Sequence, residues 1–388
     1  MAKRDNYFDY IIVGAGLSGI SLAHRLIPHL QNTGKRLLLL DRGLDSYPER
    51  TWSFWEAADS IPSSLIEANW LQIRILDETV NIQTPTAPYH YKSIRSTRWR
   101  AHYLQIIAAQ TQITIIEEAV LDIQQTLDEV SVHTATSSYQ TLHLFDSRFA
   151  PVLDIPDYVT TLWQQFYGCY IRTKYAALDP NTAVLMDFRA SQQEHIAFFY
   201  MLPSDSHTAL VEYTLFTDRP KEFSYFKRQL SDYLDQHFGH GNYEIIREEE
   251  GNIPMSSYRF PRRDGRIFYI GTAGGCTKPS TGYTFYYVQQ QIHELGRLIE
   301  KGYLNTYGRY SWPMRRFHFY DSILLQILSE QPHIGHTIFV RLFRRNPTSR
   351  IFKFLNNDTT LWEEIKLFST LPIGLFSRYA MRILFKHR

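Results

Sequence analysis

The chain has 388 residues, 44% of them hydrophobic and 21% charged. This composition excludes a disordered chain and is typical of a folded protein with a sizeable core, for which the length predicts two or three domains. The formal net charge is only +2, but residues 315–388 carry 12 Lys and Arg against 5 Asp and Glu. A basic region of this kind fits a nucleic-acid or an anionic-membrane partner.

The sequence shows neither a disulfide framework nor a targeting segment. Cys169 and Cys276 form no CxxC motif, so we expect free thiols in a reducing cytoplasm. Residues 1–10 are polar, which predicts no signal peptide, and no apolar run approaches the ~20 residues of a membrane-spanning helix. The 15 histidines have no metal-ligand spacing, so we expect no metal site.

The N-terminus predicts a strand, a glycine-rich turn, a helix and a second strand. Residues 10–13 form a short β-branched run, residues 20–30 repeat apolar side chains at helical spacing, and residues 36–40 form an apolar run that ends at Asp41. The turn has the spacing Gly-x-Gly-x-x-Gly. In this context it binds a dinucleotide, because the helix N-terminus attracts the pyrophosphate and the acid accepts hydrogen bonds from the adenosine ribose. The predicted contacts are Gly14, Ala15, Gly16, Leu17, Ser18, Gly19, Asp41 and Arg42.

The next segment is expected to be irregular over residues 43–95, where Trp, Pro and Tyr are frequent, and helical over residues 97–109. Residues 113–116 and 130–133 are expected to be strands. We expect the chain to cross into a second domain at residues 151–156, between two prolines.

Alternating apolar residues between positions 160 and 260 predict an antiparallel sheet, with residues 197–202 and 209–217 as its clearest strands. Residues 220–238 are expected to form a helix beside it. This sheet would form the second domain.

A second glycine-rich segment, residues 271–282, lies between a strand predicted at residues 266–270 and a helix predicted at residues 283–301. An N-terminal fingerprint combined with such a late glycine-rich segment favours FAD over NAD. In many FAD proteins the strand before it ends in Gly-Asp, whereas here Thr272 follows Gly271.

These elements predict an α/β fold, in which a Rossmann-type FAD-binding domain is interleaved with an antiparallel β-sheet substrate domain and followed by a helical C-terminal region. The helical pattern after residue 315 is broken near Pro332, Pro347 and Pro372. The predicted segments are 1–155 for FAD binding, with a substrate-domain insertion near 50–95, then 156–262 for the substrate sheet, 263–305 for FAD binding and 306–388 for the basic helical region.

Four short motifs resemble the bacterial lycopene β-cyclase family, FAD proteins that close the end rings of carotenoids. They are Thr51-Trp52-Ser53-Phe54, Phe198-Phe199-Tyr200-Met201-Leu202-Pro203, Leu210-Val211-Glu212-Tyr213-Thr214 and Pro279-x-Thr281-Gly282-Tyr283. Their order and spacing match from residue 8 to about residue 300. In the family's acidic motif a Glu followed two residues later by Thr carries catalysis. Here Tyr213 stands where relatives often have a second acid, so either Glu212 suffices or another carboxylate helps.

The resemblance implies a redox-neutral, acid-catalysed cyclisation of the end groups of lycopene, or of a related linear carotenoid, to β-rings. Glu212 would be the proton donor, because an apolar surrounding raises the pKa of a carboxyl; a surface carboxylate or ion-pair partner is the alternative. FAD would act in its reduced form by stabilising a cationic transition state. NADPH would serve as reductant, although no second Gly-x-Gly-x-x-Gly motif marks a site for it.

The remaining predicted site residues come from three segments. The turn that starts near Pro279 would open a helix whose positive dipole end favours an anionic flavin. Arg98 would approach the cofactor from the helix at 97–109, although a solvated helix charge explains it equally well. The further predicted cofactor contacts are Arg98, Gly271, Gly274, Gly275, Pro279, Thr281, Gly282 and Tyr283. The predicted substrate contacts, for each of which core packing is the alternative, are Trp52, Phe54, Trp55, Phe199 and Tyr200.

A polyene partitions into bilayers, so the resemblance also implies a membrane partner. Residues 338–354 and 371–388 mix Phe, Leu and Ile with Arg and Lys, a pattern typical of helices that lie in a membrane interface. We expect a cytoplasmic protein bound peripherally to the inner face of the cell membrane, with a helical cap on the substrate domain as the alternative. No nucleic-acid-binding motif accompanies the basic charge, so no such partner is expected. The oligomeric state stays open.

Two other functions fit the same pattern. A flavin-dependent monooxygenase or polyprenyl reductase would perform net redox chemistry and commonly keeps the Gly-Asp signature, which Thr272 interrupts here. A non-catalytic carotenoid- or lipid-binding flavoprotein would have no need of Glu212 in an apolar run. The sequence does not decide the ring type or whether one or both ends of the polyene are cyclised.

Overall fold

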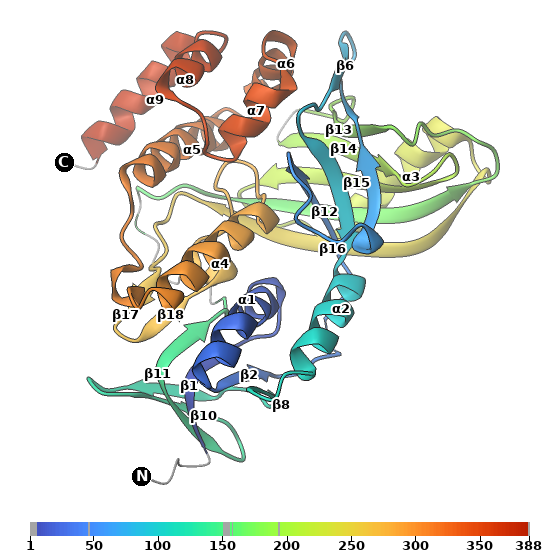
Figure 1. The fold of residues 1–388 in the computed structure, drawn as a ribbon. Coiled ribbons are helices and arrows are strands. Elements are labelled where there is room, and N and C mark those ends of the chain that lie inside the picture. The colour runs from blue at the N-terminus through green and yellow to red at the C-terminus, as the bar shows by residue number, and fades with distance from the viewer. Residues whose placement is uncertain (1–5, 46, 150–155, 157, 193–194, 387–388) are drawn as a thin grey trace.

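A mostly parallel sheet carries the N-terminal strands in the computed structural model, which describes residues 6–45, 47–149, 156, 158–192 and 195–386 (Figure 1). Its order is β17-β18-β11-β1-β2-β8. β1 (Tyr7–Val13) pairs in parallel with β2 (Leu37–Asp41) and with β11 (Ser138–Asp146), and β11 pairs in parallel with β18 (Ile267–Tyr269). A strand from beyond residue 260 thus completes the N-terminal sheet, which confirms the interleaved α/β fold. The other strands of this sheet are β8 (Ile113–Glu117), β9 (Asp122–Gln125), β10 (Val130–His133) and β17 (Arg263–Asp264).

Both faces of this sheet are covered. α1 (Leu17–Thr33) packs against α2 (Ser96–Ala108) and α4 (Phe285–Glu300), and these helices bury one face together with Leu37 and Leu39. Val130 and Val132 of β10 join the opposite face, to which Leu38 and Leu40 point. Because neither face meets water, β2 is a continuous apolar run with all its residues buried.

A second sheet, mostly antiparallel, has the order β16-β12-β15-β14-β13-β5-β6. One face packs on α3 (Phe223–Phe238), and the other meets the C-terminal helices through side chains such as Phe198 and Phe339. The predicted strands and the predicted helix are therefore present. The strands are β5 (Gln72–Leu76), β6 (Asn81–Pro85), β12 (Thr161–Thr173), β13 (Thr182–Asp187), β14 (Ile196–Pro203), β15 (Thr208–Thr217) and β16 (Tyr243–Ser256).

Residues 43–95 are not irregular, contrary to the sequence-based expectation. β5 and β6 extend the second sheet, because β5 pairs in parallel with β13. A short 3-10 helix (Ser63–Leu65) precedes β4. A separate sheet with the order β3-β7-β4 consists of β3 (Thr51–Glu56), β4 (Ile66–Trp70) and β7 (His90–Arg95). β3, β4 and β7 pair with one another within the segment, and only β5 pairs with a strand far along the chain. The crossing predicted at residues 151–156 lies outside the described residues except for Pro156.

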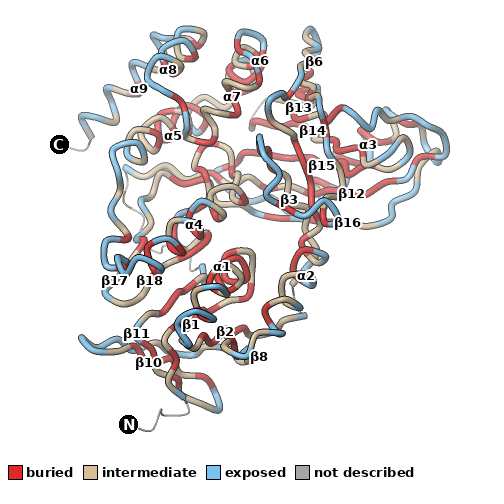
Figure 2. The backbone as a smooth tube through the Cα atoms, in the orientation of Figure 1, coloured by how far each residue is buried: buried red, intermediate tan, exposed pale blue. Residues whose placement is uncertain are grey.

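The C-terminal region is helical and lies against the second sheet (Figure 1). Three of its breaks fall at Pro332, Pro347 and Pro372 as predicted, since proline cannot donate a helical hydrogen bond, and a further break separates α7 from α8 at Asn357, which has a φ of +64°. Figure 2 shows exposed backbone along α8 and α9. Within the described residues, no helix is long and apolar enough to cross a membrane. The helices are α5 (Trp312–Glu330), α6 (Gly335–Arg345), α7 (Thr348–Leu355), α8 (Leu361–Phe368) and α9 (Ile373–Lys386), with 3-10 turns at Gly271–Gly274, Leu304–Thr306 and Pro332–Ile334.

Candidate active site

The glycine-rich turn after β1 has the geometry that its spacing predicts. Gly14 has a φ of +95°, a region that favours glycine, and its N–H donates to the Leu40 carbonyl at 2.7 Å. A Cβ on Gly19 would lie 1.8 Å from the Gly14 carbonyl oxygen, so α1 packs directly on the turn. A Cβ on Gly16 would come no closer than 3.8 Å to the Tyr47 ring, which leaves room for a phosphate group at the helix N-terminus.

Asp41, at the end of β2, holds this turn. Its carboxylate is 4% exposed. It accepts hydrogen bonds from the N–H of Ala15, from the N–H of Gly43 at 2.9 Å and from the Tyr47 hydroxyl at 2.6 Å. A carboxylate has about four acceptor positions, so one remains for a ribose hydroxyl. Arg42 beside it is exposed.

Arg100, rather than Arg98, contacts the glycine-rich turn. Arg98 is exposed and donates to the Ser64 carbonyl at 2.7 Å. Arg100 is 5% exposed, donates to the Ala15 carbonyl, and lies 3.8 Å from the centre of the Tyr47 ring. Residues two apart on a helix face different directions, so only one of these arginines can reach the turn. The expectation for Arg98 chose the wrong face of α2.

The second glycine-rich segment lies beside the first. Gly271 has a φ of +65°, and a Cβ there would lie 2.6 Å from Ser18 Oγ in the first turn of α1. A Cβ on Gly274 would lie 2.2 Å from the Tyr269 carbonyl oxygen, and Gly275 has a φ of +76°. The fold therefore brings together two glycine-rich segments that are distant in the sequence.

Residues 279–282 form a turn just before α4, which begins two residues later than the predicted start at residue 283. Gly282 has a φ of +72°, which is incompatible with an α-helix, and α4 begins at Phe285. Two polar atoms at this turn, Thr281 Oγ1 and Gln164 Oε1, are buried without a hydrogen-bond partner among the described residues. Both residues line a cavity. Buried polar atoms are nearly always satisfied, so these two indicate a bound polar group.

That cavity has a volume of about 1110 Å³ and lies between the second sheet, the second glycine-rich segment and the C-terminal helices. Its wall starts at Leu17 and Thr272, passes Glu212 on β15 and extends to Ile373 and Phe376 of α9. The volume exceeds the roughly 300–1,000 Å³ of most small-molecule sites. It is large enough for a cofactor ring at one end and a long apolar ligand at the other.

Trp52, Trp55 and Tyr200 line the cavity, as predicted for aromatic substrate contacts. Phe199 lies on the opposite face of the sheet, where its ring stacks on Tyr233 of α3 at 3.8 Å between centroids. Side chains alternate along a strand, so its neighbours in β14 face the cavity instead. Phe54 is also a core residue.

The Phe54 ring stacks on Phe285 of α4 at 4.4 Å between centroids and belongs to the core of the nucleotide-binding half. It is 4% exposed. For Phe54 and Phe199 the structure therefore supports core packing, the alternative interpretation.

Glu212 points from the centre of the second sheet into the cavity. It pairs with Gly168 of β12 on one side and with Tyr200 of β14 on the other. A Cβ on Gly168 would lie 2.7 Å from Glu212 Cγ, so the carboxyl side chain occupies space that this glycine leaves empty.

Glu249 is the second carboxyl, which the sequence did not identify. β16 pairs with the other edge of β12, where Gly168 also faces Glu249, so two glutamates flank one glycine. Glu249 is 7% exposed and accepts a hydrogen bond from Thr51 Oγ1 at 2.9 Å. Burial raises the pKa of Glu212 well above its ordinary value, and the charge of Glu249 and a hydrogen bond with it raise that pKa further, against the opposing charge of Arg50.

Tyr200 and Tyr283 belong to the polar part of the cavity wall, and the fully buried Tyr91 lies behind them. The hydroxyls of Tyr91 and Tyr200 are hydrogen-bonded, and that of Tyr283 lies 3.4 Å from Tyr91. Burial raises the pKa of each phenol well above its ordinary value, so all three stay neutral. The Trp55 ring meets the Tyr283 ring edge to face at 4.6 Å between centroids, and such ring faces can stabilise a cation.

A buried ion pair joins the 279–282 turn to the C-terminal helices. Lys278 Nζ lies 2.9 Å from Asp321 Oδ2 on α5, and it donates to Asn357 Oδ1 at 2.9 Å. Ser280 donates to the other oxygen of Asp321 at 2.6 Å. Lys278 and Asp321 are 3% and 5% exposed, so the turn is fixed to the helices that close the cavity.

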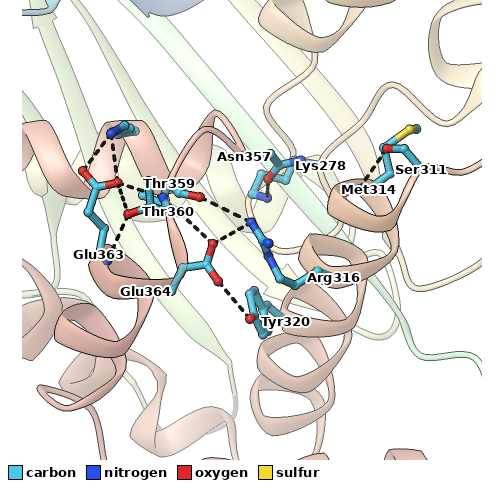
Figure 3. Close-up of polar contacts among 11 residues, drawn as sticks. Lys278, Ser311, Met314, Arg316, Tyr320, Asn357, Thr359, Thr360, Glu363 and Glu364 are labelled. Carbon is cyan, nitrogen blue, oxygen red and sulfur yellow. Dashed lines mark hydrogen bonds and ion pairs between the residues drawn. The ribbon is translucent and has the colours of Figure 1, made fainter.

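Figure 3 shows that these helices are themselves held together by polar contacts. Arg316 of α5 forms an ion pair with Glu364 of α8 at 2.9 Å, and Tyr320 donates to the second oxygen of Glu364 at 2.9 Å. Glu364 is 1% exposed. α8 is therefore part of the cavity wall rather than a loose appendage.

Comparison with known proteins agrees with this architecture. No curated protein matches the sequence. Similar solved structures include a geranylgeranyl bacteriochlorophyll reductase-like protein from Thermoplasma acidophilum, with 13% identity, a TM-score of 0.61 and coverage of 96% of this chain and 98% of that chain. A p-nitrophenol 4-monooxygenase from Pseudomonas putida DLL-E4 has 12% identity, a TM-score of 0.60 and coverage of 97% and 98%. A flavin-dependent brominase has 12% identity, a TM-score of 0.62 and coverage of 96% and 99%.

At these identities the structural likeness concerns the fold alone. The family model described as "Lycopene cyclase protein" matches residues 9–381. Because this match spans nearly the whole chain, the protein belongs to the lycopene cyclase family.

Proposed function

We propose that the protein is an FAD-dependent lycopene β-cyclase, which converts the linear end groups of lycopene to β-rings and yields β-carotene by way of γ-carotene. The observation that carries this proposal is Glu212, a half-buried carboxyl with a raised pKa that faces a large apolar cavity. A carboxyl that stays protonated near neutral pH can donate a proton to an alkene.

The residues that would hold FAD are those of the two adjoining glycine-rich segments. The open space at Gly16, the free acceptor position of Asp41 and the unpaired Thr281 hydroxyl fit a dinucleotide that ends in a polar ring. When bound in its reduced form, with NADPH as the proposed reductant, FAD supplies negative charge that stabilises a carbocation. The similar flavin-dependent brominase supports this choice of cofactor.

The chain's own residues would perform the proton chemistry. The Glu212 O–H bond breaks as its proton adds to the terminal double bond of the polyene. The resulting cation is attacked by the neighbouring double bond, the ring closes, and a proton leaves an adjacent carbon. Trp55 and Tyr200 present ring faces to the cation, and the apolar wall excludes water that would otherwise capture it.

The C-terminal helices would deliver this substrate from a membrane. α8 and α9 expose large apolar side chains, among them Trp362 at 74% and Phe385 at 70%, and Ile373 and Phe376 of α9 lie in the cavity wall. Arg378 on α9 is exposed and supplies positive charge that attracts anionic headgroups, whereas Arg382 pairs with Glu330 at 2.6 Å. We propose peripheral binding to the inner face of the cell membrane through this surface.

Sedimentation with vesicles tests the membrane proposal. Trp362→Ser is expected to weaken binding to vesicles that contain anionic lipid, because it removes apolar area from the interface. Leu127→Ser is the matched control, since Leu127 is 93% exposed on the turn between β9 and β10. Equal binding by both variants would show that Trp362 on α8 does not contribute to membrane binding.

The proposed activity is tested with purified protein, lycopene, FAD, a reductant and lipid. The expected product is a cyclic carotene of unchanged mass. The fold also resembles a monooxygenase and a reductase-like protein. A product heavier by oxygen or by hydrogen would assign the protein to one of those classes, and binding without turnover would make it a carotenoid- or lipid-binding flavoprotein.

A further inference from the structure

Two carboxyl groups meet beside the cavity, but they have different surroundings. Glu212 on β15 forms part of the cavity wall. Glu249 lies on β16, on the other side of β12, and is 7% exposed. Gly168 stands between them in the sheet. Any larger residue at that position would separate the two carboxyls, because a Cβ there already reaches within 2.7 Å of Glu212 Cγ.

A hydrogen-bond donor and a cation lie around Glu249. Thr51 Oγ1 donates a hydrogen bond to it at 2.9 Å. The charge of Arg247 acts on it as well, and the guanidinium is held 3.7 Å from the centre of the Tyr170 ring. Donors and positive charge stabilise a carboxylate. Two further acids lie nearby: Glu67 accepts a hydrogen bond from the Tyr170 hydroxyl at 3.4 Å, and Glu49 forms an ion pair with Arg247.

The groups around Glu212 are mostly uncharged. It faces the phenols of Tyr170, Tyr200 and Tyr283, and burial raises the pKa of each. Arg50 is the cation on this side, and its guanidinium donates to the Glu250 carbonyl. One negative charge in the pair is therefore placed more favourably on Glu249 than on Glu212.

We propose that Glu249 is a positioning residue for the acid chemistry of Glu212: the two carboxyls share one proton, with the hydrogen on Glu212 and the negative charge on Glu249. This inference rests on the proposed cyclase function. Glu249 acts through Glu212, and it supplies the second acid that Tyr213 does not.

The shared proton also accounts for both proton transfers of the reaction. When the Glu212 O–H bond breaks and a C–H bond forms on the polyene, two adjacent carboxylates remain. Their repulsion makes Glu212 a strong base, so the proton that leaves the ring carbon re-forms the Glu212 O–H bond. The pair ends each cycle as it began, and no electrons are transferred.

The test is the pH dependence of kcat in Glu249→Gln and Glu249→Asp. Glu212 must be protonated to act, so activity falls as pH rises through its raised pKa. Glu249→Gln removes the charge that raises this pKa. The alkaline limb of the pH profile, where kcat falls as pH rises, is therefore expected to shift to lower pH by about one pH unit or more. At a pH above the alkaline limbs of both the wild type and the variant, a shift of one pH unit corresponds to an about tenfold lower kcat in the variant. Glu249→Asp keeps the charge and is expected to retain most of the wild-type limb.

Glu250→Gln is the matched control, because it makes the same change on the exposed neighbour in β16. The alkaline limb of kcat in Glu250→Gln is expected to coincide with that of the wild type. The flavin content of each variant checks that it is folded. A Glu249→Gln protein that loses activity with an unmoved alkaline limb would make Glu249 merely structural and overturn the proposal.

An infrared titration without substrate separates this proposal from the cyclase function. The carbonyl stretch of the protonated Glu212 carboxyl is assigned by its absence in Glu212→Gln. Its midpoint is expected to fall in Glu249→Gln. A lowered midpoint in a protein that does not cyclise lycopene supports the pair and rejects the cyclase, whereas an unchanged midpoint in an active cyclase rejects the pair.

Discussion

The glycine-rich turn after β1 and the carboxyl pair of the second sheet each depend on a glycine, but for different reasons. Gly19 lets a helix approach the backbone, since a Cβ there would lie 1.8 Å from the Gly14 carbonyl oxygen. Gly168 leaves space for a side chain, since a Cβ there would lie 2.7 Å from Glu212 Cγ. The Gly14 carbonyl oxygen belongs to the backbone and cannot move without the sheet, whereas the Glu212 side chain can rotate away. The same substitution, glycine to alanine, should therefore abolish cofactor binding at Gly19 but only weaken the carboxyl pair at Gly168.

The largest effect is expected from Gly19→Ala. The new methyl group would overlap backbone of the turn after β1 at 1.8 Å, so its cost exceeds the about 1–3 kcal/mol of ordinary core overpacking. We expect almost no bound flavin and little folded protein, measured by flavin absorbance and circular dichroism. Gly374→Ala on α9 is the control, because no atom lies within 4 Å of its added Cβ. A flavin-replete Gly19→Ala protein would show that α1 need not touch the turn.

Glu212→Gln should affect the carboxyl pair without affecting the glycine-rich turn that would bind FAD. Amide for carboxyl changes little in shape but removes the acidic proton, and a positioned general acid contributes about 10²–10⁴-fold to rate. We expect kcat to fall by that factor while flavin content stays at the wild-type level. Retained activity would remove Glu212 from the mechanism.

The same contrast explains what could be predicted from the sequence. The glycine-rich turn is a run of six residues whose spacing alone predicts its geometry, and the proline breaks after α5, α6 and α8 are equally local. Glu249 stands in a run of three glutamates, Glu248–Glu250, and the alternation of a strand allows only the middle one to face Glu212. That choice requires the register of β12 with β16, which no local pattern contains.

The errors in the aromatic contacts and in the arginine have the same origin. Phe199 and Tyr200 differ by one position in β14, and Arg98 and Arg100 differ by two in α2. Each error concerns which face of an element is turned inward, which depends on what packs against it. In residues 43–95, β5 pairs with β13, about a hundred residues further along the chain, and β3 pairs with β7, about 40 residues away, so neither pairing follows from a local pattern.

Lys278→Met tests the junction between the two regions. It leaves Asp321 buried without its cation, and breaking a buried ion pair costs about 3–5 kcal/mol. We expect this loss in urea unfolding, together with weaker flavin retention, because Lys278 lies beside the 279–282 turn. Lys353→Met is the control: its pair with Glu363 is 36% and 31% exposed, so its removal should cost below about 1 kcal/mol. Similar losses in both variants would deny the buried pair a special role.

Gly168→Ala is expected to have the smallest effect and to define the comparison most sharply. The methyl group meets the flexible Glu212 side chain rather than backbone, so the fold and the flavin should survive. Glu212 must rotate away from Glu249, which weakens the interaction that raises the pKa of Glu212. The alkaline limb of kcat should therefore move to lower pH, and the rate above it should fall about tenfold for each pH unit that the limb moves. Gly168→Ala combined with Glu249→Gln should move the limb no further than Glu249→Gln alone, because both changes remove the same interaction. Additive displacements of the limb would mean that Gly168 and Glu249 act on Glu212 independently, and the carboxyl pair would then not be a single unit.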